Sequence, residues 1–144
     1  MKIAIGSDHG GFTMKEELKE YLKEKGYDVT DCGTYSEESI DYPDIAMETA
    51  KKIISKENEL GVLLCGTGIG ISIAANKIDG IRAALCTDCY CAKMARNHND
   101  ANVLCMGGRV TGIELAKSIL DTFLNEKFEG GRHSIRVDKI KSLE

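Results

Sequence analysis

The chain of 144 residues lacks any apolar run that approaches the roughly 18 residues needed to cross a membrane. Its first residues also lack the succession of basic, apolar and small residues that marks a signal peptide. No run of like charges forms a polybasic arm or an acidic tail. These absences exclude the membrane-spanning and exported classes from the prediction, and we expect a cytoplasmic protein.

Positive charge is also scarce, since 19 Lys and Arg residues stand against 23 Asp and Glu residues, for a net charge of −4. This balance offers no excess of cations to neutralise nucleic-acid phosphates, so we expect no nucleic-acid partner. The sequence has one proline and no tryptophan, and it contains no repeat or low-complexity linker. We therefore predict a single domain over residues 1–144.

Six cysteines raise the question of a disulfide framework or a metal site. Without an export signal, and in a chain large enough to bury its own core, we expect free thiols. Cys86 and Cys89 form a Cys-x-x-Cys spacing, but no second Cys or His pair completes a tetrahedral zinc site. We expect no bound metal, and Cys86, Cys89 and Cys91 are predicted to be buried or idle.

Short apolar runs alternate with longer amphipathic stretches, which predicts repeated strand–helix units. Predicted strands cover residues 3–6, 27–32, 61–65, 81–86 and 102–106. Predicted helices cover residues 13–25, 45–54, 71–77, 89–97 and 111–124, and residues 13–16 and 111–114 match capping boxes. The continuous apolar run at 61–65 predicts a central strand covered on both faces. The sum is one doubly wound, Rossmann-like α/β domain with a five-stranded parallel sheet.

Ligands of doubly wound sheets bind beyond the carboxyl ends of the strands. Polar clusters follow three predicted strands, at residues 7–9, 65–70 and 107–109. Residues 97–100 precede the fifth strand instead, and so should lie at the opposite edge of their own subunit. This placement predicts that His98 and its neighbours serve the pocket of an adjacent chain.

The strongest local pattern is Gly66-x-Gly68-x-Gly70, between a buried strand and a helix. Glycines let backbone N–H groups turn inward, and such a nest stabilises a phosphate or the oxyanion of a reacting sugar. No Gly-Lys-Ser/Thr follows as in a Walker loop, and the third glycine comes one residue too early for a dinucleotide fingerprint. A tight turn without a ligand is the alternative for the loop alone.

Ionisable side chains flank this pattern. Cys65 adjoins the nest, where the positive end of a helix favours the thiolate, a usable base or nucleophile. Asp8 and His9 follow the first strand and are suited to handling sugar hydroxyl protons or a phosphate. His98 is suited to acid–base work. Taken singly, each of these residues is more often structural.

The sequence has five arginines and fourteen lysines, and three of the arginines are Arg109, Arg132 and Arg136. These three stand beside glycine-rich turns, and the last two share a face if the C-terminal segment is helical. Guanidinium groups match phosphate oxygens better than an ammonium does. We therefore expect this set to bind a phosphate.

Together these segments resemble the type B ribose-5-phosphate isomerase family, which includes the galactose-6-phosphate isomerase subunits. The resemblance covers essentially the whole chain. Its motifs are SDHGG (7–11), DYP (41–43), CGTGIGISIAANK (65–77), GIRA (80–83), HNDANVL (98–104), GGRV (107–110) and EGGRH (129–133), followed by Arg136 and Val137.

The resemblance implies an aldose–ketose isomerisation of the pentose phosphate pathway, through a cis-enediolate and without metal or cofactor. Cys65 would move the proton between C2 and C1, and His98 would assist opening of the furanose ring. The loop backbone, with the Thr67 hydroxyl, would stabilise the enediolate oxygen. The residues implied to bind substrate are Asp8, His9, Gly66, Thr67, Gly68, Ile69, Gly70, Asn99, Arg109, Arg132 and Arg136.

One branch of the family uses a glutamate base a few positions later in the loop, where this chain has Ile71. The resemblance therefore assigns the base to Cys65. It also implies sites shared between subunits, so we expect a homodimer or a dimer of dimers. A six-carbon substrate (allose or galactose 6-phosphate) and a non-catalytic sugar-phosphate-binding module are the alternatives.

Overall fold

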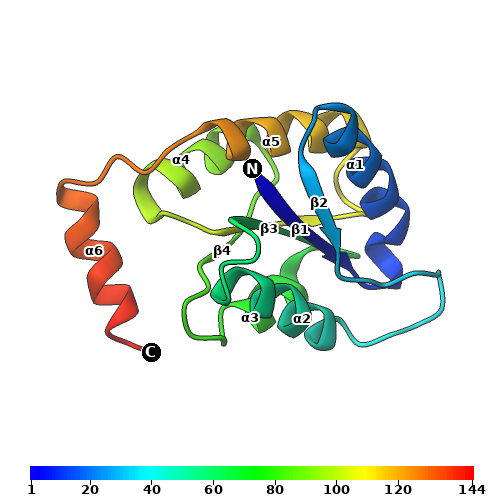
Figure 1. Ribbon diagram of the computed structural model, residues 1–144, viewed down its shortest axis with the longest axis horizontal. Helices are drawn as coiled ribbons and strands as arrows, with labels where there is room; N and C mark the ends of the chain where they lie inside the picture. Colours follow the sequence, from blue (N-terminus) through cyan, green and yellow to red (C-terminus); the bar gives the residue numbers. More distant parts are fainter.

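Five parallel strands form a single sheet in the order β2-β1-β3-β5-β4 in the computed structural model, which describes all 144 residues (Figure 1). The strands are β1 (Lys2–Ser7), β2 (Asp28–Asp31), β3 (Leu60–Cys65), β4 (Ala83–Leu85) and β5 (Val103–Gly107). The predicted five-stranded parallel sheet is confirmed. All six residues of β3 are buried, as expected of a central strand that carries helices on both faces.

Helices cover both faces of this sheet (Figure 1). One layer contains α1 (Phe12–Glu24), α4 (Cys89–Asn99) and α5 (Ile113–Asn125), and the other contains α2 (Tyr42–Ile54) and α3 (Ile69–Ala75). A short 3-10 turn, η1 (His9–Gly11), leads from β1 into α1, and the last helix, α6 (Arg132–Lys141), stands apart from the sheet beside α4. None of the helices is long and apolar enough to span a lipid bilayer.

The capping boxes predicted at residues 13–16 and 111–114 are wrong. Both α1 and α5 start after a glycine, and neither start has a side-chain cap. The chain is already coiled in η1 when it reaches α1, because Asp8 Oδ1 accepts hydrogen bonds from the N–H groups of Gly10 and Gly11 at 2.8 and 3.2 Å. The helix start is thereby moved toward the end of β1, close to the predicted site.

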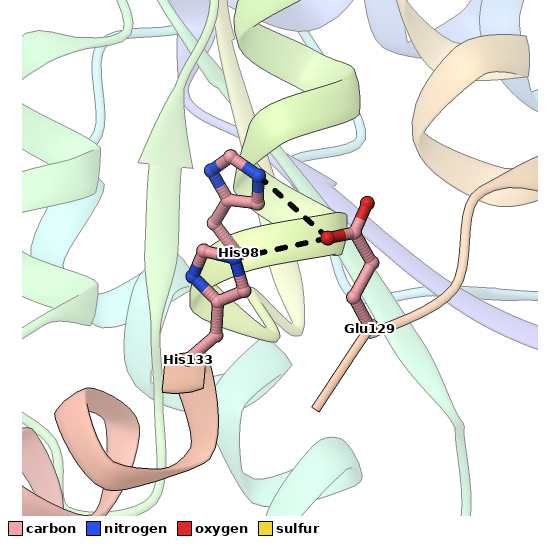
Figure 2. A group of neighbouring side chains, drawn as sticks. All are labelled: His98, Glu129 and His133. Atoms are coloured by element: carbon pink, nitrogen blue, oxygen red, sulfur yellow. Dashed lines mark ion pairs between the residues drawn. The ribbon is translucent and has the colours of Figure 1, made fainter. Parts of the chain in front are cut away.

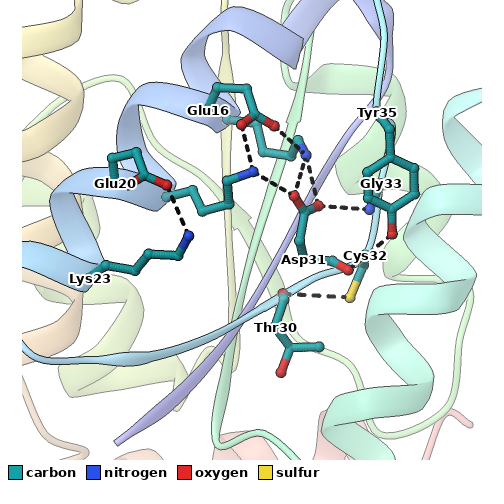
Figure 3. A network of polar contacts seen from close by, with 10 residues as sticks. Glu16, Glu20, Lys23, Thr30, Asp31, Cys32, Gly33 and Tyr35 are labelled. Carbon is teal, nitrogen blue, oxygen red and sulfur yellow. Dashed lines mark hydrogen bonds and ion pairs between the residues drawn. The ribbon is translucent and has the colours of Figure 1, made fainter.

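A fully buried lysine ties α1 to β2 (Figure 3). Lys15 Nζ donates to both carboxylate oxygens of Asp31 at 2.7 and 2.8 Å, and it lies 2.9 Å from Glu16 Oε1. Lys19 Nζ donates to Asp31 at 2.9 Å, and Gly33 N donates at 3.0 Å. Burial alone would raise the pKa of Asp31, but the hydrogen bonds from the two lysines outweigh it and hold that pKa below its usual range.

Asp31→Asn is expected to lower the free energy of unfolding by about 3 kcal/mol, because the buried ammonium of Lys15 loses its main counter-charge. Urea denaturation measures this loss. The matched control is Glu20→Gln, which removes an exposed pair with Lys23 at 2.9 Å and should change the free energy by less than about 1 kcal/mol.

The same pair predicts a pH dependence. The pKa of Asp31 is depressed in the folded state, so its contribution is present above the unfolded-state pKa of about 3.9. It is lost as the pH falls through the folded-state pKa. The difference in the free energy of unfolding between wild type and Asp31→Asn should therefore decrease below about pH 4. A difference in the free energy of unfolding that stayed constant down to strongly acidic pH would contradict this account.

Candidate active site

Three turns meet at the carboxyl edge of the sheet, after β1, β3 and β5. The strand register pairs Ser7 with Leu64 and Cys65 with Gly107, so these strands end side by side. Backbone hydrogen bonds join the turns, from Gly108 N to Cys65 O at 2.8 Å and from Asp8 N to Leu64 O at 3.1 Å. The three clusters predicted at residues 7–9, 65–70 and 107–109 are thus brought together in one chain.

Two glycines, Gly68 in the turn after β3 and Gly10 in the turn after β1, stand where the turns approach each other too closely for a side chain. Gly68 has φ +79°, and a Cβ there would lie 2.7 Å from the carbonyl carbon of Met106. A Cβ on Gly10 would lie 2.9 Å from Gly66 N. Real Cβ atoms do not approach backbone this closely, so a larger residue at either position would push the turns apart. The close approach leaves the backbone N–H groups as the lining of the loop.

Cys65 lies at the base of this loop. Its side chain is 4% exposed, and its Sγ accepts a hydrogen bond from Gly68 N at 3.0 Å. This hydrogen bond holds the sulfur against the backbone of the glycine loop. The sulfur therefore sits where it can exchange a proton with a group bound in the loop.

The other cysteines lack this setting, and all six are free thiols. Cys86 is 1% exposed, and burial raises the pKa of its thiol to about 12. Burial also raises the pKa of the fully buried Cys105 and that of Cys32. Groups so shifted stay protonated near neutrality, which leaves them without acid–base use. Cys91 is exposed and its pKa is raised first by its hydrogen bond to Asp88.

Two further side chains shape the loop. Thr67 Oγ1 accepts a hydrogen bond from Ile69 N at 3.2 Å, so the hydroxyl proton is directed elsewhere and can be donated to a ligand. The guanidinium of Arg109 covers Gly66, since a Cβ on that glycine would lie 3.2 Å from Arg109 Nη1. A permanent positive charge at the loop favours an anionic ligand.

A cleft of about 540 Å³ opens beside the loop, between the turn after β1 and the start of α2. Asp8 and His9 line it together with residues 39–44. His9 Nδ1 accepts a hydrogen bond from Ile40 N at 3.3 Å, which leaves Nε2 to face a ligand. Tyr42 also reaches the loop, because a Cβ on Gly70 would lie 2.8 Å from its hydroxyl oxygen. Tyr42 belongs to the DYP motif (41–43), but it was not among the residues predicted for the site.

His98 and Asn99 lie at the opposite edge of the sheet, as predicted. Both belong to the last turn of α4, which leads into the start of β5, whereas Cys65 is paired with the residue at the end of β5. The five residues of β5 separate these ends by about 13 Å along the strand direction. Within one chain, the Cys65 loop and His98 do not share a pocket.

Arg132 and Arg136 also lie away from the loop. They are exposed residues of α6, so the C-terminal segment is helical and their spacing places them on one face of that helix. Because α6 packs beside α4 rather than against the carboxyl edge, this pair shares the location of His98 and not that of Arg109 (Figure 1). The residues predicted for the site therefore fall into two separate groups within one chain.

The fold and the loop are typical of α/β enzymes with a doubly wound sheet, whose ligand sites lie at the carboxyl edge, and the loop is suited to an anion. The chain belongs to the ribose/galactose isomerase family, whose model matches residues 3–140. It is 51% identical to ribose-5-phosphate isomerase B of Escherichia coli over 99% of this chain and 96% of that protein.

Solved structures agree with this membership. Ribose-5-phosphate isomerase B of Clostridium thermocellum superposes with a TM-score of 0.98 at 55% identity, covering 99% of this chain and 97% of that one. The type B ribose 5-phosphate isomerase of Trypanosoma brucei gives a TM-score of 0.95 at 49% identity, covering 99% and 98%. The chain is thus an aldose–ketose isomerase of this family.

Proposed function

We propose that this chain interconverts ribose 5-phosphate and ribulose 5-phosphate through a cis-enediolate. The observation that carries the proposal is the buried Cys65 Sγ, 3.0 Å from Gly68 N at the base of a glycine loop. Relatives that are 46–51% identical are named ribose-5-phosphate isomerase B, which supports the choice of substrate. Such a reaction belongs to the pentose phosphate pathway, and we place it in the cytoplasm.

In the proposed mechanism, the Cys65 thiolate removes the C2 proton of the open-chain aldose. The electron pair of that C–H bond forms the C1–C2 double bond, and the carbonyl oxygen becomes the enediolate oxygen. The N–H groups of residues 66–70 and the Thr67 hydroxyl stabilise that oxygen. The O2 hydroxyl proton passes to O1, C1 takes the proton back from Cys65 with the electron pair of the C1–C2 double bond, and the C2–O2 double bond forms. A positioned general base accelerates the reaction by about 10²–10⁴-fold, and an oxyanion site accelerates it by about 10²–10³-fold.

The remaining predicted residues hold the substrate in this proposal. Asp8 and His9 contact sugar hydroxyls from the cleft beside the loop, and Asn99 holds further hydroxyls. Arg109, Arg132 and Arg136 bind the phosphate, far from the reacting carbons. Binding energy at the phosphate orients the open-chain sugar over Cys65 and lowers the entropic cost of reaction.

We further propose a homodimer in which each site combines the Cys65 loop of one chain with the α4–α6 edge of the other. The separation of the two halves within one chain supports this arrangement. Beside the loop, α3 exposes Ile69 and Ile73, which are 52% and 58% accessible and four residues apart. Apolar side chains exposed on one helix face are suited to burial against a second copy.

A substrate panel tests the proposed function. The chain is incubated with ribose 5-phosphate, allose 6-phosphate and galactose 6-phosphate, and ketose formation is measured. We expect kcat/KM to be highest for ribose 5-phosphate, by about 10-fold or more, because an extra carbon must fit between Cys65 and the phosphate-binding arginines. A preference for a six-carbon substrate would reassign the enzyme within the family. Binding without conversion of any of the three would indicate a non-catalytic module.

A further inference from the structure

Two histidines and a glutamate meet at the α4–α6 edge (Figure 2). The rings of His98 and His133 are stacked, with centroids 4.0 Å apart and planes 9° from parallel. Glu129 Oε2 lies 3.9 Å from His98 Nε2 and 3.7 Å from His133 Nε2. Of the three, only His98 was predicted to take part in the reaction, in opening of the furanose ring.

The stack does not have the geometry of a metal site. A metal ion bound through an imidazole nitrogen lies near the plane of that ring, because the lone pair lies in the plane. No point lies near both of two nearly parallel planes separated by a ring stack. Both rings would have to turn before they could chelate one ion. The arrangement instead resembles a support that holds one ring in a single orientation.

The partners of His98 are themselves held in place. His133 is 9% exposed, in the first turn of α6. The backbone N of Glu129 donates to Asn97 O at 3.0 Å. The amide of Asn97, 4% exposed, donates to Lys127 O at 2.8 Å, so the segment that carries Glu129 is bound to the last turn of α4. Desolvation and the adjacent His98 lower the pKa of His133, which favours its neutral form.

We propose that His133 and Glu129 are positioning residues that orient His98 for opening of the sugar ring. His133 fixes the plane of the His98 ring by stacking, and the Glu129 carboxylate, 3.9 Å from His98 Nε2, attracts that edge of the ring electrostatically. This inference rests on the proposed function and extends it to two residues that do not touch the reacting carbons.

The step that depends on this orientation is a proton transfer. The C1–O4 bond of the furanose breaks, its electron pair goes to O4, and O4 takes a proton from His98. The O1–H electron pair becomes the second C1–O1 bond, and the O1 proton passes to water. Misplacement of a proton donor by about 1 Å can cost up to about 10²-fold in rate.

Two assays separate this step from the enediolate step. Isomerisation of ribose 5-phosphate requires ring opening, because that sugar is mainly cyclic. Exchange of the C1 proton of ribulose 5-phosphate with D2O requires the enediolate alone, because O5 carries the phosphate and no furanose forms. His133→Ala should slow isomerisation by about 10-fold or more, and Glu129→Gln by several-fold, with exchange within about twofold of wild type.

Conservative and control variants sharpen the test. His133→Phe keeps a flat ring and should restore most of the isomerisation lost in His133→Ala. The chain has only three histidines, so the His98 imidazole can be followed by NMR. Its Hε1 resonance should move downfield in His133→Ala, where the neighbouring ring is removed, and stay near the wild-type position in His133→Phe. Asp138→Asn, which changes an exposed carboxylate on α6, should alter neither assay.

Equal loss of both activities in His133→Ala and Glu129→Gln would overturn the inference, since it would indicate a structural role. Unchanged isomerisation and an unmoved His98 resonance in these variants would also overturn it. Failure of the wild-type chain to isomerise ribose 5-phosphate would instead overturn the proposed function. The wild-type measurement therefore distinguishes the two failures.

Discussion

Cys65→Ala is expected to reduce kcat for ribose 5-phosphate by about 10²–10⁴-fold, the contribution of a positioned general base. Cys65 Sγ lies at the base of the loop, in contact with Gly68 N, and a methyl group cannot carry the proton between C2 and C1. The loop itself offers no carboxylate to take over this role, since it continues into the buried Ile71. The measurement is the rate of ribulose 5-phosphate formation.

The fold and phosphate binding should survive this change, since alanine is small and the loop is held by backbone hydrogen bonds. Calorimetric titration with ribitol 5-phosphate, which lacks a carbonyl, measures binding separately from chemistry. Cys105→Ala is the matched control, because it removes a fully buried thiol of β5 that is not hydrogen-bonded to the loop. It should retain activity. Substantial turnover by Cys65→Ala would remove this residue from the mechanism.

Mixing two inactive variants is expected to restore activity if the site is shared between chains. In a heterodimer of Cys65→Ala and His98→Ala, one site carries both changes and the other carries neither. Random exchange of equal amounts makes half of the dimers mixed, so activity should approach about a quarter of the wild-type value. The reason is geometric, since His98 and Cys65 lie at opposite edges of the same sheet.

Subunit exchange must be demonstrated in the same samples, by mixing under mild denaturation followed by refolding and sizing. Each variant mixed with itself serves as the control and should stay at its own low activity. If exchange occurs and activity does not rise, the two residues act within one chain or His98 has no role. A monomeric wild-type chain in the sizing measurement would equally contradict the shared site.

Hydrophobic periodicity was sufficient for the fold class, because burial on both faces of a parallel strand leaves a continuous apolar run such as residues 60–65. It was insufficient for the starts of α1 and α5. Capping patterns at residues 13–16 and 111–114 were present in the sequence, but the N-cap positions are Gly11 in α1 and Gly112 in α5, so the helix starts before Thr13 in one case and after Thr111 in the other. A local capping motif does not predict the start of a helix when the preceding segment determines where the chain enters that helix.

The site divides in the same way. Strand ends can be located from sequence, and strands that run parallel must end at one edge, so the meeting of residues 7–9, 65–70 and 107–109 was predictable. The placement of His98 at the other edge followed from the same rule. Tyr42 was not assigned, because only the packing of α2 against the loop brings its hydroxyl to Gly70.

The sequence by itself determined the α/β class, the glycine loop that follows Cys65, and the separation of that loop from His98. These depend on apolar patterns and on residues adjacent along the chain. Only the tertiary structure decided the strand order, the hydrogen bond from Gly68 N to Cys65 Sγ, and the stack of His98 on His133 beside Glu129. Side-chain orientation between distant segments depends on how α4 and α6 pack, and no local pattern encodes it.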